Sequence, residues 1–544
     1  MYKKTPFLLF GKEYLLLIIS VIIFSIINVL MAPNIHMSYR IVTFTLSLLF
    51  LKAIRLTALR IILALPLLFL CSADISLSLY SWFTFKTPFN DGFAASTLES
   101  NPIEMLAMLG VYIRFVIICL ALLVLFILAI RPAQGRMISK KITGTLLIII
   151  CAIALASSVK FVKKRPASEG ASSELKVAAR FTTYMPFFNM SYFLTAIQES
   201  QILKNISGAA PHYSLSVKDT GIDTYVLIIG ESERAKNMSI YGYQKPTTPL
   251  LEAQKPYLKL FNQAISGVPF TSVAVPMALS ADNIHNHNIT NYSDNIINLA
   301  NQAGFHTMWL SAQTAFGNYG SSVAGIAMNA EDKLYIKGYD KELLPHLKTA
   351  LQKPTHDKKL IVLHLYGSHE PACKRYPANE TVFDKSETVF DKSNDIDACY
   401  DNSVRYTDSL LGEVFGLLKQ NKASVFYFSD HALERDLRQS APYFHGGITP
   451  SQEAYHVPMF IWYSPALASQ DKDETGQVNA VFSTSYNDIL IATWLGVTDA
   501  QRGAFGNINA VIEKFAGDSS VLDNRYEKLD YHQLRKTAEE PLSH

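Results

Sequence analysis

The stretch Thr224–Ser232, TYVLIIGES, decides the fold of the C-terminal part of the chain. Its centre, Tyr225–Ile229, is a short continuous apolar run rich in β-branched residues, which is typical of a strand buried on both faces. Similar runs follow later: Leu360–Leu365 (LIVLHL), Ser424–Phe428 (SVFYF) and Val457–Tyr463 (VPMFIWY). Longer segments with helical spacing, such as Ser293–Ala303 and Ser403–Gln420, separate them. This alternation predicts an α/β domain with a mainly parallel sheet covered by helices on both faces.

Ionisable residues follow three of the predicted strands. Glu231 comes directly after the first strand, His369 follows the LIVLHL strand, and Asp430 with His431 follows the SVFYF strand. Ligands of such sheets bind beyond the carboxyl ends of the strands, and carboxylates with imidazoles suit a divalent metal. A single Asp-His pair after a strand is more often a cap or a turn than a ligand pair. Its coincidence with two other strand ends predicts a metal site.

A nucleophile is expected in the segment Ser266–Ser280 (SGVPFTSVAVPMALS), where small residues and prolines surround Thr271 and Ser272. A hydroxyl is a poor nucleophile unless a base or a metal ion lowers its pKa. Beside a zinc ion, the alkoxide of either residue becomes accessible. The pattern by itself does not choose between Thr271 and Ser272.

The first 160 residues differ in composition from the rest of the chain. Of the 544 residues, 49% are hydrophobic and 17% are charged, and almost all the long apolar runs lie before residue 160. These runs are Tyr14–Met31, Ile41–Leu51, Ile61–Trp82, Phe115–Ile130 and Gly144–Val159. A bilayer span needs roughly 20 mostly apolar residues, so the second run crosses only with its flanking residues. Five consecutive runs predict a five-helix transmembrane domain rather than buried core helices, and the first run lacks the small-residue cleavage site of a signal peptide.

Basic residues near the ends of the runs predict the orientation of this domain. Those expected in the cytoplasm are Lys3, Lys4, Lys12, Lys52, Arg55, Arg60, Arg131, Arg136, Lys140 and Lys141. Those expected on the other side, between the runs, are Arg40, Lys86 and Arg114. The four basic residues at positions 160–165 oppose this orientation, but a long following domain is translocated largely regardless of charge. The C-terminal domain is therefore expected outside the cytoplasm.

The boundaries of three regions follow from these patterns. Residues 1–160 form the transmembrane domain, residues 161–215 a linker with membrane-surface helices, and residues 216–544 the exported catalytic domain. Pro166–Leu175 has the Ser, Ala, Gly and Glu content of a linker. Phe181–Ile206 is dense in aromatic residues, which predicts helices lying on the bilayer surface; packing on the exported domain is the equal alternative.

The five cysteines fall into two groups. Cys71, Cys119 and Cys151 lie within predicted spans and serve there as small apolar residues. Cys373 and Cys399 lie in the exported domain, where an oxidising compartment allows a disulfide between them. The bridge would close a polar loop with a tandem duplication, which we interpret as a tolerated surface insertion. The repeated segments are Glu380–Ser386 and Glu387–Ser393.

A series of short motifs resembles the phosphoethanolamine transferases of the alkaline phosphatase superfamily. In chain order they are Gly230-Glu231-Ser232, Met238–Tyr243 (MSIYGY), Thr247-Thr248-Pro249, Gly367–Pro371 (GSHEP), Arg375-Tyr376-Pro377, Tyr400–Ser403 (YDNS), Tyr406–Asp408 (YTD), Ser429–His431 (SDH) and His445-Gly446. They occur in the order of the family, the five apolar runs also fit, and the resemblance covers nearly the whole chain. It implies an alkaline-phosphatase-like domain in the periplasm, anchored in a bacterial inner membrane.

The resemblance implies a nucleophile and a metal. Thr271 matches the threonine nucleophile of the family, because Pro276 follows it at the family's spacing, and it would carry phosphoethanolamine in the intermediate. Glu231, Asp430 and His431 match the remaining ligands of zinc. One or more Zn²⁺ ions are expected, with Mn²⁺ or another divalent ion as the alternative.

The resemblance also implies a donor and an acceptor. Phosphatidylethanolamine would give its headgroup to Thr271, and lipopolysaccharide core, lipid A or a periplasmic glucan would receive it. His369 and His445 match histidines that hold the donor or acceptor phosphate, act as acid or base, or bind a second metal. Glu99 resembles a family position near the lipid substrate; a solvated loop residue is the alternative. The net charge of only +3 gives no indication of a nucleic-acid partner.

The chain departs from the family pattern at several positions. Gly267 and Met277 stand where the lipid A branch has cysteines. Ala432 replaces the usual glycine after Asp-His, and the following glutamate is displaced to Glu434. Trp309–Gln313 (WLSAQ) is nearer to the branches that act on core sugars or glucans. These departures leave the acceptor open.

Three other functions compete with this interpretation. A glycerol-phosphate transferase of the lipoteichoic acid synthase type shares the five spans and the threonine, but GSHEP and YDNS favour phosphoethanolamine transfer. A sulfatase or phosphodiesterase is disfavoured, because no arginine of the formylglycine signal follows Thr271. A catalytically silent envelope protein is disfavoured by the retained ionisable residues, although Ala432 and Glu434 keep it open.

Overall fold

The chain folds into two compact units, Met1–Gln201 and Ile202–His544, each with hydrophobic cores of its own. The computed structural model describes residues 6–31, 36–85, 88–90, 93–94, 97–98, 109–132, 139–164, 173–206, 211–313, 322–354, 357–383, 392–436, 443–445, 450–467, 475–500, 502–503 and 505–540. Glu99, most of the predicted linker and much of the tandem duplication lie outside these residues.

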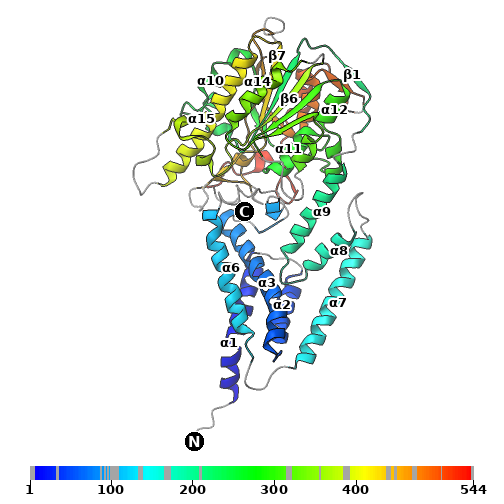
Figure 1. The fold of residues 1–544 in the computed structure, drawn as a ribbon, viewed down its shortest axis with the longest axis vertical. Helices are drawn as coiled ribbons and strands as arrows, with labels where there is room; N and C mark the ends of the chain where they lie inside the picture. The colour runs from blue at the N-terminus through cyan, green and yellow to red at the C-terminus, as the bar shows by residue number, and fades with distance from the viewer. Residues whose placement is uncertain are drawn as a thin grey trace. The chain divides into compact units, whose positions relative to one another are not determined.

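The N-terminal unit is helical (Figure 1). Its long helices are α1 (Pro6–Met31), α2 (Met37–Lys52), α3 (Thr57–Phe85), α6 (Leu109–Ala129) and α7 (Lys140–Lys164). Among the described residues, four of these helices, α1, α3, α6 and α7, are long and apolar enough to cross a membrane. Helix α2 has 16 residues, and at about 1.5 Å per residue it is shorter than a hydrocarbon core of roughly 30 Å. The prediction of a fifth span at Ile41–Leu51 is therefore not confirmed.

The aromatic segment after α7 forms helices α8 (Ser173–Thr182) and α9 (Met190–Ile206). The turn between them packs inside the N-terminal unit, where Tyr184, Met185 and Phe188 are buried. Asn189 ties this turn to α3, because its backbone N–H donates to Asp74 Oδ1 (2.7 Å) and its amide donates to the Asp74 carbonyl (3.0 Å). The most aromatic part of the segment thus contacts the helices of its own unit.

An eight-stranded sheet forms the centre of the C-terminal unit, in the order β11-β3-β10-β7-β2-β6-β4-β5. The strands are β2 (Thr224–Gly230), β3 (Leu258–Ile265), β4 (His306–Ser311), β5 (Asp332–Tyr335), β6 (Lys359–His364), β7 (Ala423–Ser429), β10 (Met459–Tyr463) and β11 (Gly476–Ser483). Strand β10 pairs antiparallel with β3 and β7, and the other pairings in this sheet are parallel. The predicted mainly parallel sheet is confirmed. Two-stranded sheets pair β1 (Leu215–Val217) with β12 (Val497–Asp499), β8 (Glu434–Arg435) with β9 (Tyr443–Phe444), and β13 (Ser520–Leu522) with β14 (Lys528–Asp530).

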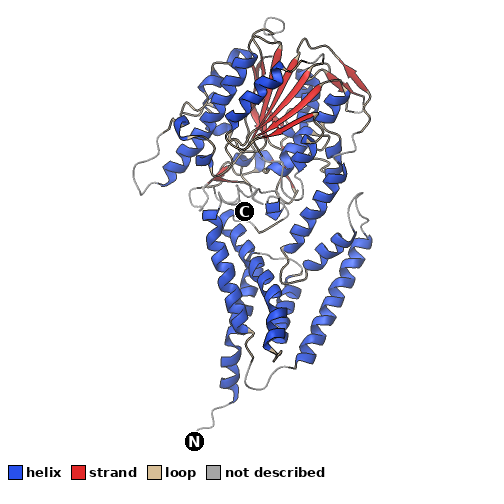
Figure 2. Ribbon diagram, in the orientation of Figure 1, coloured by secondary structure: helices blue, strands red, loops and turns tan. Residues whose placement is uncertain are grey.

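Helices cover both faces of the large sheet (Figure 2). They are α10 (Pro249–Glu252), α11 (Thr271–Leu279), α12 (Ile296–Gln302), α13 (Ser322–Ala327), α14 (Leu344–Gln352), α15 (Lys392–Leu418), α16 (Asn487–Trp494) and α17 (Ile508–Phe515). Strand β2 shows why both faces need cover: Tyr225, Leu227 and Ile229 join the core beneath α12, α16 and α17. Val226 and Ile228 point the other way, into the core beneath α10, α14 and α15. A run that is apolar on every residue is therefore buried on both sides.

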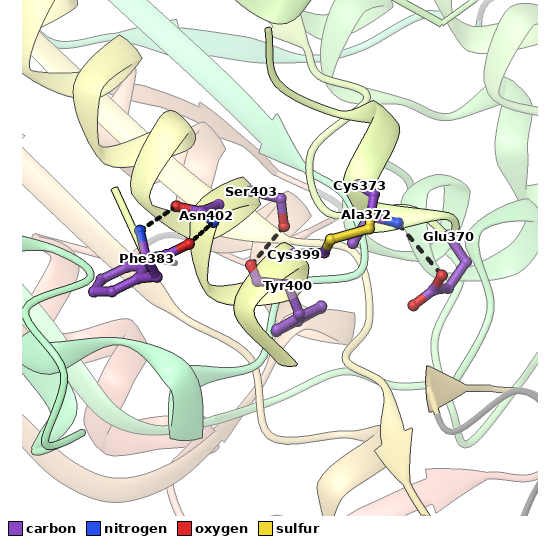
Figure 3. Close-up of a disulfide and its surroundings, with 8 residues drawn as sticks. All are labelled: Glu370, Ala372, Cys373, Phe383, Cys399, Tyr400, Asn402 and Ser403. Carbon is purple, nitrogen blue, oxygen red and sulfur yellow. Dashed lines mark hydrogen bonds between the residues drawn. A yellow bond between two sulfur atoms is a disulfide. The ribbon is translucent and has the colours of Figure 1, made fainter. Parts of the chain in front are cut away.

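The predicted disulfide between Cys373 and Cys399 is confirmed, with the two Cα atoms 4.6 Å apart (Figure 3). It joins the loop after β6 to helix α15. Asn402, one turn along α15, accepts hydrogen bonds from the backbone N–H groups of Val382 and Phe383 (both 2.8 Å). The described segment of the insertion before α15, residues 374–383, is thus held to this helix at both ends, by the disulfide and by Asn402.

Candidate active site

Parallel register brings the ligand candidates together at the carboxyl edge of the sheet. Strands β2 and β7 pair with Gly230 opposite Ser429, so the residues that follow them, Glu231 and Asp430, emerge side by side. One side-chain ligand atom from each of Glu231, Asp430 and His431 lies within 4.8 Å of the others, in a buried cluster that could hold a metal ion.

Thr271 is the first residue of helix α11, and its hydroxyl faces this cluster. Its Oγ1 lies 3.1 Å from Glu231 Oε2 and 3.2 Å from His431 Nε2. The unpaired N–H groups of a helix N-terminus favour an anion at this position. The hydroxyl that contacts Glu231 and His431 is thus that of Thr271, which agrees with the family match, whereas the sequence pattern alone left Thr271 and Ser272 open.

The two buried carboxylates have opposite protonation tendencies. Burial alone would raise the pKa of Glu231, but His431 and His369, when protonated, lower it. Burial, together with the Glu231 charge, raises the pKa of Asp430. Asp430 Oδ1 accepts hydrogen bonds from the N–H groups of Ser232 (3.0 Å) and His431 (2.7 Å), whereas its buried Oδ2 has no well-oriented donor in the described chain. A buried, unfilled acceptor beside a second carboxylate fits a divalent cation, which would favour the charged forms of both groups.

His431 is oriented for metal binding. Its Nδ1 lies 2.9 Å from the Ala432 carbonyl, so Nδ1 carries the proton and the Nε2 lone pair faces the carboxylates. Nε2 is 3.5 Å from Glu231 Oε1 and 3.4 Å from Asp430 Oδ2. Burial lowers the pKa of this imidazole. The residues of the cluster therefore provide the nitrogen and oxygen donors that Zn²⁺ accepts.

The other two predicted histidines lie beside the cluster. The His445 ring is 4.4 Å from the His431 ring, centroid to centroid, and burial lowers the pKa of His445. His369 is half-buried; its Nδ1 lies 2.8 Å from the Glu370 carbonyl. In their protonated forms, both imidazoles would lower the pKa of Glu231.

Two contacts to Glu231 were not foreseen from the sequence. Ser232 Oγ donates to Glu231 Oε1 (2.6 Å), and Gln313 Nε2 donates to Glu231 Oε2 (3.1 Å). In the sequence, these two residues stood out only by their positions. Ser232 directly follows the predicted ligand Glu231, and Gln313 is the last residue of the WLSAQ segment.

Several motif residues support the loop after β2. Tyr400 OH donates to the Ser232 carbonyl (2.7 Å) and accepts from the Arg234 N–H (3.0 Å). Asp401 accepts from Asn237 Nδ2 (3.1 Å) and pairs with Lys245 (2.6 Å). The YDNS motif thus binds the segment that leads away from Glu231.

The departures from the family pattern also have structural counterparts. A Cβ atom on Gly267 would lie 2.8 Å from Met277 Sδ, so the two positions are neighbours and the methionine fills the space between them. Glu434 is buried away from the ligand cluster, where it accepts from the Ser451 N–H (2.7 Å) and lies 3.4 Å from Arg535.

Comparisons with known proteins agree with this fold. The "Transferase YhbX N-terminal domain" family matches residues 1–207, and the "Sulfatase" family matches residues 223–500. YhbX of Escherichia coli (strain K12) is 50% identical over 525 residues, which cover 96% of this chain and 95% of YhbX. Phosphoethanolamine transferase EptC of the same strain is 26% identical over 408 residues, 69% of each chain.

Solved structures share the fold. The integral membrane protein lipooligosaccharide phosphoethanolamine transferase A of Neisseria meningitidis matches with a TM-score of 0.61 at 19% identity, over 89% of this chain and 95% of that one. The zinc complex of the C-terminal periplasmic domain of EptC from Escherichia coli matches with a TM-score of 0.53 at 24% identity, over 60% and 98%. Residues 223–500 therefore form a domain of the sulfatase and alkaline phosphatase superfamily. The chain belongs to the YhbX family of this superfamily, whose homologues include proteins named phosphoethanolamine transferases.

Proposed function

We propose that this protein transfers phosphoethanolamine from phosphatidylethanolamine to an envelope acceptor through Thr271. The observation that carries the proposal is the position of the Thr271 hydroxyl, 3.1 Å from Glu231 Oε2 and 3.2 Å from His431 Nε2. The relatives named phosphoethanolamine transferases support phosphoethanolamine as the group that is transferred.

Glu231, Thr271, Asp430 and His431 are the residues that would hold zinc. When bound, zinc would lower the pKa of the Thr271 hydroxyl and neutralise negative charge on the phosphoryl oxygens. The chain itself contributes the buried side chains of Glu231, Asp430 and His431 from the ends of β2 and β7, and the Thr271 hydroxyl beside them at the start of α11.

The reaction proceeds in two displacements. Thr271 Oγ1 releases its proton to solvent and attacks the donor phosphorus. The bond from phosphorus to the diacylglycerol oxygen breaks, and the leaving oxygen takes a proton from protonated His369 or His445. An acceptor hydroxyl then attacks the phosphorus of the phosphothreonine and loses its proton to the same histidine. The bond from phosphorus to Thr271 Oγ1 breaks, and Oγ1 takes up a proton from solvent. Glu99 is the candidate contact to the lipid donor.

The membrane arrangement belongs to the same proposal. Residues 1–160 would span a bacterial inner membrane five times, with α2 crossing together with its flanking residues. Residues 161–215 would connect this domain to the periplasmic catalytic domain, residues 216–544. The disulfide between Cys373 and Cys399 supports an oxidising compartment for that domain.

The test is to express the full-length protein in a host lacking related enzymes and to record mass spectra of three acceptors: lipid A, core oligosaccharide and periplasmic glucan. One phosphoethanolamine unit is expected on one of them, lost in Thr271→Ala and retained in the control Ser272→Ala. Phosphoethanolamine transfer that persists in Thr271→Ala would refute the proposed nucleophile. No gain on any fraction, with no phosphoethanolamine on Thr271 of the purified protein, would refute the activity.

A further inference from the structure

Each oxygen of the Glu231 carboxylate is held by its own donor. Ser232 Oγ donates to Oε1 (2.6 Å), and Gln313 Nε2 donates to Oε2 (3.1 Å). The same Oε2 accepts the hydroxyl of Thr271 (3.1 Å). A carboxylate with one donor can still rotate about its terminal C–C bond, whereas donors on both oxygens fix its plane. Gln313 therefore acts on the oxygen that faces the proposed nucleophile.

The Gln313 amide is itself held in place. Its Nε2 also donates to the carbonyl of Leu365 (2.8 Å), so both amide hydrogens have acceptors. Leu365 in turn donates from its N–H to the Ile229 carbonyl (3.0 Å), two residues before Glu231. The amide thus connects the Glu231 side chain to the backbone at the ends of β6 and β2.

The backbone of Gln313 is fixed by Ser311, the last residue of β4. Ser311 Oγ accepts from the Gln313 N–H (3.1 Å) and donates to the Gln313 carbonyl (2.8 Å). His364 pairs with Ser311 across strands β4 and β6, and its Nδ1 lies 3.2 Å from the same Oγ. Because that hydroxyl proton is used by Gln313, His364 Nδ1 is the donor to Ser311. These bonds fix Gln313 at the end of a strand instead of leaving it on an unsupported loop.

We propose that Gln313 is a positioning residue that holds Glu231 Oε2 toward Thr271 and the metal, with Ser232 as its counterpart on Oε1. The inference rests on the proposed function and adds a specific support to its metal site. Hydrogen-bond partners of metal ligands orient the ligand before the ion binds, and their loss costs about 10–100-fold in metal affinity. Gln313 contributes without touching the transferred group.

The experiment compares Gln313→Met with the wild type and with Gln302→Met. Methionine keeps the length of the side chain and removes the donor. Gln302 is a suitable control because it is exposed and donates to a carbonyl outside the site, that of Pro211 (2.8 Å). Zinc affinity of each full-length protein is measured by competition with a chromophoric chelator. Gln313→Met should bind zinc about 10–100-fold more weakly, and Gln302→Met should match the wild type.

A kinetic readout separates positioning from substrate contact. At saturating zinc, Gln313→Met should show a lower kcat with an unchanged KM for the donor lipid. Unchanged zinc affinity, or a raised KM at an unchanged kcat, would overturn the inference. If Gln313→Met does not fold, Ser311→Ala replaces it, since it loosens the backbone of Gln313 and should also weaken zinc binding. Wild-type protein that binds no zinc would instead overturn the proposed metal site itself.

Discussion

Replacing Gly367 with alanine should lower the free energy of unfolding of the C-terminal unit by about 2–5 kcal/mol. Gly367 has a φ of +53°, a conformation that costs a residue with a Cβ about 1–2 kcal/mol. The added Cβ would also lie 2.5 Å from the backbone oxygen of Glu231, and overpacking of this kind costs about 1–3 kcal/mol.

The loop around Gly367 has little freedom to relax. The N–H groups of Tyr366 and Gly367 donate to the two oxygens of Asp340 (2.7 and 2.9 Å), and the Ser368 N–H donates to the Glu231 carbonyl (2.9 Å). Moving the loop away from the added methyl group would break these bonds. The clash should therefore displace Glu231, and zinc affinity should fall together with stability.

The assay is denaturant unfolding of the full-length protein in detergent, followed by tryptophan fluorescence. Trp309, Trp462 and Trp494 are fully buried in the C-terminal unit and report on its unfolding. Gly304→Ala is the matched control: Gly304 has a φ of +83° and an added Cβ would meet nothing within 4 Å. It should cost only the conformational term of about 1–2 kcal/mol. Equal losses in the two variants would refute the close approach of Gly367 to Glu231.

Two further changes test the C-terminal unit away from the ligand cluster. Burial raises the pKa of Glu434 to about 7, so the folded state retains a proton that the unfolded chain releases above about pH 4.5. The stability that this proton contributes to the folded state is present at low pH and is lost as the pH rises to about 7. It amounts to up to about 3 kcal/mol. In the wild type, the denaturant midpoint should fall between pH 5 and 8, and in Glu434→Gln this fall should be smaller. An equally steep fall in the variant would contradict the role of Glu434. The double variant Cys373→Ser with Cys399→Ser should lose about 3–4 kcal/mol, because the bridge closes a loop with a separation of 26 residues. Thermal unfolding measures the loss, with Cys119→Ser as the control, and free thiols at both positions in non-reduced wild-type protein would contradict the bridge.

Much of the architecture could be predicted because its signals are local. The continuous apolar run in β2 predicted burial on both faces, and β2 indeed contributes alternate residues to two cores. Ionisable residues at strand ends predicted where ligands would gather, since parallel strands place their carboxyl ends at one edge. The length of helix α2 was harder to predict, because apolar residues in a run do not determine where the helix around them begins and ends.

Local patterns in the sequence were enough to predict the mainly parallel sheet and the strand ends that carry Glu231, Asp430 and His431. The family resemblance pointed to Thr271 rather than Ser272, and tertiary packing brings the Thr271 hydroxyl to those side chains. Only this packing places Gln313 on Glu231, 82 residues away. The physical reason is the range of the interactions. Periodicity and chain direction are set by neighbours in the sequence, whereas a hydrogen bond to a side chain requires a position within about 3 Å. Only the packing of separate strands and helices defines positions that closely.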